Sequence, residues 1–152
     1  MAVSFLDERE RVIRQQQDAL RELSTPVLPV RERLLILPII GVLDGERAVQ
    51  LTEQLLHAIR KHRAKVVVID ITGCPEADAA VANHLVQTVD ASRLMGASVI
   101  ITGMSPTVAQ TLVTLGVDLS KMHTIGDLQG GLEEAERLLD SARPVGGGAL
   151  TP

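Results

Sequence analysis

Cys74 is the residue with the clearest potential for covalent chemistry, because a thiolate is a strong nucleophile. It lies in the stretch VVVIDITGCPEADAAVANHLV (66–86), shortly after an apolar run. Loops at the carboxyl ends of buried strands often carry function in α/β proteins. A reactive thiolate needs positively charged surroundings, however, and the charged neighbours here are Glu76 and Asp78. We therefore interpret Cys74 as a thiol that fills the loop.

Three acids around the same loop, Asp70, Glu76 and Asp78, could supply a general acid and a general base. Asp78 immediately precedes a helical pattern, where an aspartate side chain accepts hydrogen bonds from the first backbone N–H groups. We expect Asp78 to be this N-cap, so capping is favoured over catalysis and no catalytic residue is assigned. An α/β enzyme that uses Cys74 or the acids stays open as a third interpretation.

The spacing of the glycines does not indicate a nucleotide-binding site, and the spacing of the histidines does not indicate a metal site. The phosphate-binding motifs GxGxxG and GxxxxGK followed by Ser or Thr are both missing from the sequence. His57 and His62 are five residues apart and so lie on different faces of a helix, and His84 and His123 have no partner at metal-ligand spacing. We expect no cofactor and no metal site.

Four hydroxyl side chains lie on or just before one predicted helix: Ser105, Thr107, Thr111 and Thr114. Ser105, which is followed by a proline, is typical of an N-cap. A threonine inside a helix is usually neutral or slightly unfavourable. The presence of Thr111 therefore needs an explanation that composition alone does not give.

The elements that must position these residues alternate between strands and helices. We expect extended segments at 27–30 and 33–41, strands at 65–71, 98–103 and 122–125, and helices at 5–23, 44–62, 78–95, 105–116 and 127–142. This alternation predicts an α/β fold with a largely parallel sheet. Pro29 and Pro38 favour edge positions or bulges over a central ladder. We divide the chain into a linker or dimerisation helix (1–24), one domain (25–142) and a disordered tail (143–152).

The predicted helix 5–23 carries Leu6, Ile13 and Leu20 at heptad spacing. This stripe favours a short coiled-coil seam and therefore a homodimer, although Arg9 and Gln16 weaken it at the other core positions. A helix that docks on its own domain is the alternative.

The composition narrows the classes of partner. The 152 residues carry a net charge of −4, and Phe5 is the only aromatic residue, which disfavours nucleic acid because base stacking needs aromatic rings. A single cysteine suits a reducing compartment. No apolar run approaches ~18 residues and the first 20 residues are polar, so we expect a cytoplasmic protein without a membrane partner.

Five blocks occur in an order that resembles a known family: LSTPVLPV, LPIIGVLDGERA, VVVIDITGCPEADAAVANHL, ITGMSPTVAQTLVTLGVDL and LQGGLEEA. Over about residues 9–140 the chain resembles the STAS domain of RsbR-type stressosome proteins, which are related to anti-sigma-factor antagonists. The resemblance implies a STAS fold, with a mixed, mostly parallel sheet of about four or five strands, about four packing helices and an N-terminal linker helix.

The resemblance also implies a non-catalytic role. RsbR-type domains assemble with an RsbS-type STAS paralogue and hold a switch serine/threonine kinase, which phosphorylation releases. A freestanding anti-sigma-factor antagonist that binds a single partner is the alternative. Full RsbR-type proteins carry a sensor domain before the linker helix, and whether one belongs before this chain stays open.

Two acceptor threonines are typical of the RsbR group. One falls in the block VAQTLVTLG and corresponds to Thr111, where we expect phosphorylation. The other follows the aspartate at the helix opening, where this chain has Ala79, which has no hydroxyl. The resemblance thus predicts a kinase-docking tip that is not itself modified. Its residues are Thr72, Gly73, Cys74, Pro75, Glu76, Asp78 and Ala79.

Overall fold

The computed structural model describes residues 27–41, 44–74, 78–118, 120 and 122–142. The predicted helix 5–23 and the predicted tail 143–152 lie outside these residues, as do Pro75 and Glu76 of the predicted tip. The elements are β1 (Leu28–Arg31), β2 (Leu34–Ile40), α2 (Gly45–His62), β3 (Val66–Gly73), α3 (Ala79–Leu94), β4 (Ser98–Thr102), α4 (Pro106–Thr114), β5 (His123–Ile125) and α5 (Leu128–Ala142). Every element predicted between 27 and 142 is present, and no boundary differs by more than two residues.

The strands form one five-stranded sheet in the order β1-β2-β3-β4-β5. β1 is antiparallel to β2, and the other neighbouring pairs are parallel, which confirms the mixed, mostly parallel sheet. β3 continues to Gly73, two residues beyond its predicted end at 71. The extension arises because the β2–β3 register shifts after Pro38, and Ile40 then pairs with Gly73.

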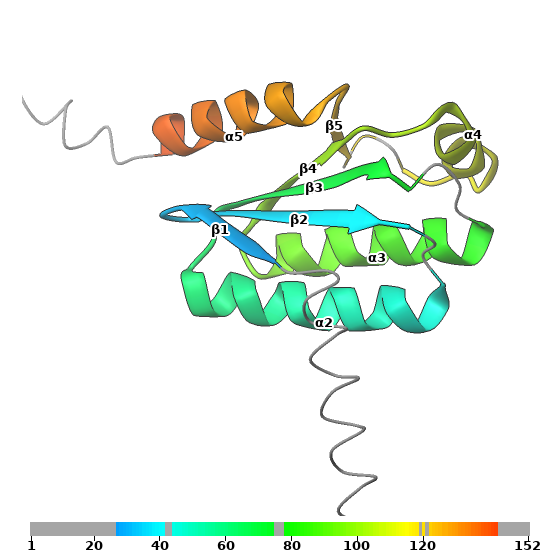
Figure 1. Ribbon diagram of the computed structural model, residues 1–152, viewed down its shortest axis with the longest axis horizontal. Helices are drawn as coiled ribbons and strands as arrows, with labels where there is room; N and C mark the ends of the chain where they lie inside the picture. The colour runs from blue at the N-terminus through cyan, green and yellow to red at the C-terminus, as the bar shows by residue number, and fades with distance from the viewer. Residues whose placement is uncertain (1–26, 42–43, 75–77, 119, 121, 143–152) are drawn as a thin grey trace, which may run out of the picture.

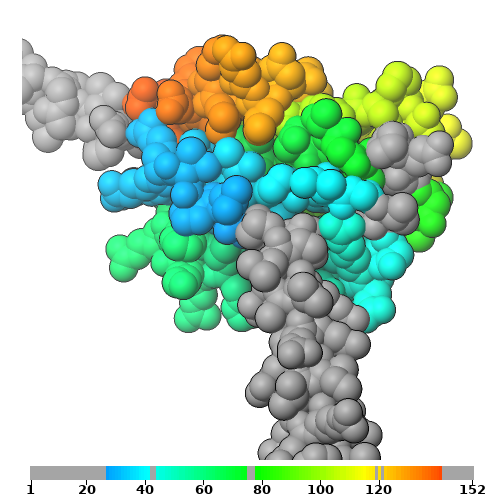
Figure 2. All heavy atoms as spheres, in the orientation of Figure 1, coloured from blue at the N-terminus to red at the C-terminus, as the bar shows by residue number. Residues whose placement is uncertain are grey.

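Helices cover both faces of the sheet. Val67 of β3 belongs to a buried cluster with Leu55 of α2 and Val89 of α3, whereas Val68 belongs to a second cluster with Ala135 of α5. Figure 1 shows α2 and α3 side by side on one face and α5 on the other. The space-filling view shows α5 (orange) and α2 on opposite sides of the β1–β2 hairpin (Figure 2). The apolar run in β3 is thus buried on both faces, as a strand without alternation predicts.

Both strand prolines occupy edge positions, as predicted. Pro29 lies in β1, the first strand of the sheet. Pro38 lies in β2 beyond Ile36, the last β2 residue that pairs with β1, so only β3 flanks it. The missing N–H of each proline therefore leaves the central ladder intact.

The parallel strands bring several sequence-distant loops to one end of the sheet. The β2 and β3 arrowheads point to the right in Figure 1, toward α4 and the first turn of α3. The β1–β2 turn and the C-terminal end of α2 lie at the opposite end. Within the described residues, no helix combines the length and the hydrophobicity that a membrane crossing requires.

Candidate functional site

The described part of the predicted tip lies where β3 ends and α3 begins. Thr72 and Gly73 are exposed at the end of β3, and Asp78 and Ala79 are exposed at the start of α3. Cys74 lies beneath them, with only 3% of its surface exposed. We call the four exposed residues the tip surface. The structure therefore places together every residue of the predicted docking tip that it describes.

A buried threonine organises the end of β3. Thr102, the last residue of β4, pairs with Asp70 of β3 and donates its hydroxyl to Asp70 Oδ1 at 2.8 Å. Thr72 donates its hydroxyl to the same oxygen, also at 2.8 Å. Thr102 is fully buried, whereas Thr72 is exposed. Asp70 thus accepts hydrogen bonds that fix the end of the strand, which gives this acid a structural role.

Two glycines allow neighbouring segments to approach Thr72 and Thr102 closely. Gly103 has φ +74°, and a Cβ atom there would lie 1.9 Å from Thr72 Oγ1. On the α5 side, a Cβ atom at Gly131 would lie 2.3 Å from the methyl carbon of Thr102. Because neither glycine has a side chain, the loop after β4 approaches Thr72 closely, and α5 approaches Thr102.

Asp78 is the N-cap of α3, as the sequence predicts. Its Oδ1 accepts a hydrogen bond from the backbone N–H of Val81 at 2.8 Å. Its carbonyl oxygen accepts the first bond of the helix, from Ala82 N at 2.9 Å. Ala79 follows as the first helical residue and is exposed. The tip surface therefore presents a capped helix start and the methyl group of Ala79.

Cys74 is held in the apolar core. Its N–H donates to Ile71 O at 3.0 Å, and its side chain belongs to the same buried cluster as Val89. This burial confirms the interpretation of Cys74 as a thiol that fills the loop. A thiol in such surroundings is poorly placed to attack a substrate.

Thr111 lies on α4, which follows β4 and packs against α3. Its side chain is half-buried, and its hydroxyl donates to Thr107 O at 2.9 Å. The Thr111 carbonyl oxygen accepts the N–H of Leu115, the C-cap of the helix, at 3.0 Å. The back-bond to Thr107 explains how the helix accommodates this threonine. The predicted N-cap of α4 is confirmed, because Ser105 Oγ accepts Val108 N–H at 3.1 Å.

The histidines do not form a metal centre in the described part of the chain, where no group of three or more His, Cys, Asp or Glu residues could hold an ion. His84 instead contacts a hydroxyl pair between α2 and α3. Thr52 Oγ1 lies 2.6 Å from Thr88 Oγ1 and 3.2 Å from His84 Nε2. Sequence reasoning missed this pair and also missed Thr102. Thr102 could have been singled out from the sequence, because it is a polar residue at the end of the apolar run in SVIIT (98–102).

Comparison with known proteins places this geometry in a family. Residues 25–129 match the model of the STAS domain. RsbT co-antagonist protein RsbRA of Bacillus subtilis is 44% identical over 131 residues, which cover 86% of this chain and 48% of that protein. RsbT co-antagonist protein RsbRD of the same organism is 35% identical over 109 residues, or 72% of this chain and 39% of that protein. The chain thus spans less than half the length of these two relatives.

Solved structures agree with the sequence comparison. RsbS of Moorella thermoacetica superposes with a TM-score of 0.67 at 33% identity, over 75% of this chain and 98% of that chain. A chain from a structure of the molecular architecture of the stressosome superposes with a TM-score of 0.64 at 32% identity, over the same fractions. This chain therefore shares its fold with these two proteins.

Proposed function

Since the chain belongs to the STAS domain family, we propose that it is a non-catalytic scaffold and regulatory subunit of a stressosome-type complex in the cytoplasm. It assembles with an RsbS-type STAS paralogue and holds a switch serine/threonine kinase until phosphorylation releases that kinase. The likeness to RsbRA, a co-antagonist of RsbT, is the observation that carries this proposal. The likeness to RsbS and to a stressosome chain supports the assembly.

The kinase docks on the tip surface, together with Pro75 and Glu76. The hydroxyl of Thr72 is engaged by Asp70, and the carboxylate of Asp78 caps α3. Cys74 is buried. With its polar groups engaged in structure, the tip offers shape and a helix N-terminus to a partner instead of reactive chemistry. This supports recognition without catalysis.

Phosphorylation of Thr111 controls the release of the kinase. A phosphate there adds about −1.5 to −2 charges within the last turns of α4, at the negative end of the helix dipole. It also requires the hydroxyl to leave Thr107 O. The added charge weakens the C-terminal end of α4, next to the exposed side chains of Val113 and Leu115. Phosphorylation of Thr111 therefore loosens a helix that packs on α3, whose first turn belongs to the tip surface.

Self-association is assigned to the segment 1–24. Leu6, Ile13 and Leu20 supply an apolar stripe, and burial of such side chains between two chains contributes about 1.5–3 kcal/mol each. Two copies joined in this way present two tip surfaces to the assembly.

The test is a reconstitution with an RsbS-type paralogue and its switch kinase. We expect sedimentation to show a particle far larger than either STAS protein, with the kinase bound, and we expect ATP to release the kinase. Thr111→Ala should retain the kinase in the presence of ATP. Thr114→Ala changes an exposed hydroxyl on the same helix and should release it normally. A one-to-one complex without large particles would contradict the proposal and indicate a freestanding anti-sigma-factor antagonist.

A further inference from the structure

Ile40 is an apolar side chain that lies exposed beside the tip surface. It is the last residue of β2 and the only exposed one in that strand, with 63% of its surface accessible. Ile39 is buried in the cluster that contains side chains of α2 and α3, and successive residues of a strand point to opposite faces. Ile40 therefore points to the α5 face of the sheet. α5 packs on β3, β4 and β5, and Ile40 at the end of β2 stays accessible.

A bulge in β3 places Gly73 next to Ile40. After Pro38, two steps along β2 match three steps along β3, until Ile40 pairs with Gly73. The extra residue shifts the alternation of β3, because Ile71 and, three residues later, Cys74 belong to the same buried cluster. Gly73 is therefore turned to the exposed side. Bulges are frequent beside functional sites, where they change the direction of a side chain.

The Ile40 side chain lies against the backbone of β3, because Gly73 has no side chain. A Cβ atom at residue 73 would lie 3.5 Å from Ile40 Cγ1 and 3.3 Å from Ile39 O. The two strand ends are also joined by a hydrogen bond, since Gly41 N–H donates to Gly73 O at 3.1 Å. Gly41 has φ +83°, a backbone conformation that glycine adopts without strain. Ile40 is thus held in contact with the tip surface and extends it with an apolar side chain.

The polar side chains of the tip surface already have partners within the chain. Thr72 donates to Asp70, and Asp78 Oδ1 accepts the N–H of Val81. A partner protein gains little from such groups, because each new hydrogen bond would replace an existing one. Burial of apolar surface requires no such exchange, and the binding energy of an interface is concentrated in a few buried side chains. The tip surface itself contains no large apolar side chain, and Ile40 supplies one.

We propose that Ile40 is the apolar anchor of the docking site and inserts into an apolar pocket of the switch kinase. This inference rests on the proposed function, in which the tip surface binds that kinase. The kinase is favoured as the partner because Ile40 pairs with Gly73 and is continuous with the tip surface. The kinase surface opposite Ile40 is apolar, since a charged group there would be desolvated without a partner. Ile40 therefore contributes to the choice of kinase as well as to the affinity.

The test measures binding of the switch kinase to the complex of the full chain with its RsbS-type paralogue. Ile40→Ser should raise the dissociation constant of the kinase at least about thirtyfold, because the apolar contact is lost. Ile40→Val keeps a branched apolar side chain and should raise it less than about fivefold. Because the side chain is exposed, thermal unfolding should show nearly the same stability for both variants and the unaltered chain.

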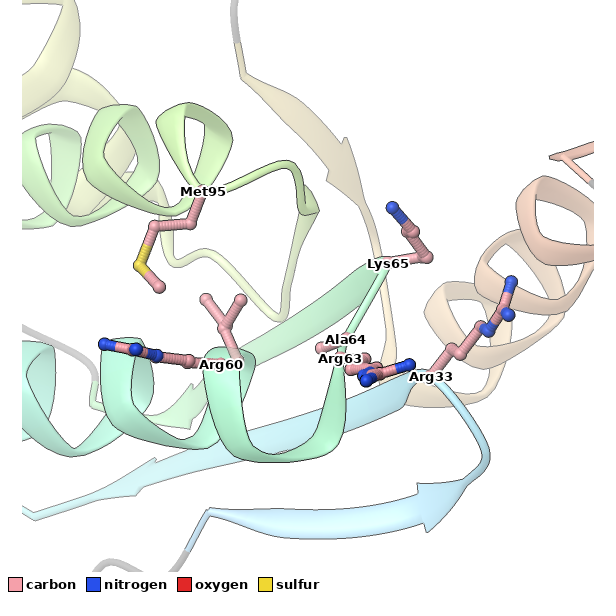
Figure 3. Close-up of a pocket in the computed structure, with 7 residues that line it drawn as sticks. Arg33, Arg60, Arg63, Ala64, Lys65 and Met95 are labelled. Carbon is pink, nitrogen blue, oxygen red and sulfur yellow. The ribbon is translucent and has the colours of Figure 1, made fainter.

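Leu94→Ser is the matched control at the opposite end of the sheet. Leu94 is 89% exposed and ends α3. It directly precedes Met95, which lines a hollow together with Arg60 from the last turn of α2 (Figure 3). Leu94→Ser also removes an exposed apolar side chain, and it should leave the affinity for the kinase unchanged. An equal loss of affinity in Ile40→Ser and Leu94→Ser would overturn the proposal.

Ala79→Arg separates a failure of this inference from a failure of the proposed function. A large charged side chain at the first residue of α3 covers the tip surface and should abolish kinase binding. If Ala79→Arg abolishes binding and Ile40→Ser does not weaken it, the tip surface docks the kinase without this anchor, and only the present inference fails. If neither variant weakens binding, the kinase docks elsewhere and both fail. Loss of the large particle in sedimentation of Ile40→Ser would assign Ile40 to a neighbouring STAS subunit and overturn its role as the kinase anchor.

Discussion

Gly103 and Thr72 are so close that a Cβ atom at residue 103 would lie 1.9 Å from the Thr72 hydroxyl oxygen. The same Cβ atom would lie 2.8 Å from the Thr72 backbone nitrogen, so a rotation of the Thr72 side chain alone does not relieve the contact. The loop after β4 and the end of β3 are therefore locked together at the base of the tip surface.

The first prediction is that Gly103→Ala destabilises the protein by about 2–4 kcal/mol. About 1–2 kcal/mol of this comes from the left-handed backbone, and the rest comes from overpacking against Thr72. Gly96→Ala is a matched control, because Gly96 has φ +93° but a Cβ atom there would meet nothing within 4 Å. Urea titrations should show the smaller loss for Gly96→Ala. Equal losses would mean that the contact with Thr72 is unimportant.

The second prediction concerns the cap of α3. Asp78→Ala should cost about 0.5–2 kcal/mol, because Val81 N–H loses its acceptor. Asp78→Asn should be nearly neutral, since asparagine caps as well as aspartate. Denaturant unfolding and kinase binding are measured on both variants. If Asp78→Asn keeps its stability but loses the kinase, the carboxylate is a recognition group and its role is not only structural.

The third prediction concerns the hydroxyl pair between α2 and α3. Thr52→Val or Thr88→Val should each cost about 0.5–1.5 kcal/mol, because the other hydroxyl loses a partner 2.6 Å away but still donates to a carbonyl of its own helix. The double variant should cost less than the sum of the single ones, since both polar groups are then removed. Strict additivity would show that the two hydroxyls do not interact. Thr111→Val serves as the reference, because the Thr111 hydroxyl makes the same bond to a carbonyl of its own helix that Thr52 and Thr88 make, so it measures that contribution by itself.

The fourth prediction is that residues 1–23 carry self-association. A chain that lacks them should show weaker dimers in sedimentation, because the stripe of Leu6, Ile13 and Leu20 is lost. The matched control is the full chain with Arg11→Gln, which changes a charge outside the core positions of the heptad pattern. Equally strong dimers of the truncated chain would assign the contact to the sheet domain instead.

Local signals in the sequence were sufficient for the elements of the fold. The run from Val66 to Ile69 has no alternation and is buried on both faces. Asp78 and Ser105 precede helical patterns, and each caps its helix. These features depend on a few neighbouring residues, so a single sequence contains them.

Features that join distant segments were not predictable in the same way. Asp70 and Thr102 are 32 residues apart, and their hydrogen bond depends on the β3–β4 register. Arg33 and Lys65 directly precede β2 and β3, and only the parallel pairing of Leu34 with Val66 brings these two residues together. The last two residues of β3 were missed because Thr72 and Gly73 do not continue the apolar run.

The last prediction concerns which residue the switch kinase phosphorylates. We expect the switch kinase to modify Thr111 and no residue between 70 and 85. Thr72 is the only hydroxyl residue between 70 and 85. It donates to Asp70 and lies against Gly103, so its oxygen is poorly available for phosphoryl transfer. Mass spectrometry after incubation with kinase and ATP checks both sites, and phosphate on Thr72, or none on Thr111, would contradict the assignment.

Ala79→Thr provides the converse experiment. The new hydroxyl would stand exposed at the first helical residue, where a phosphate is stabilised by the N-terminal end of α3. If the tip surface docks the kinase, residue 79 should become a second site of phosphorylation and ATP should then release the kinase more completely. The control is Ala80→Thr, one position further along the exposed start of α3. If neither variant is modified at the tip while Thr111 still is, the kinase binds elsewhere, and the tip surface is not its docking site.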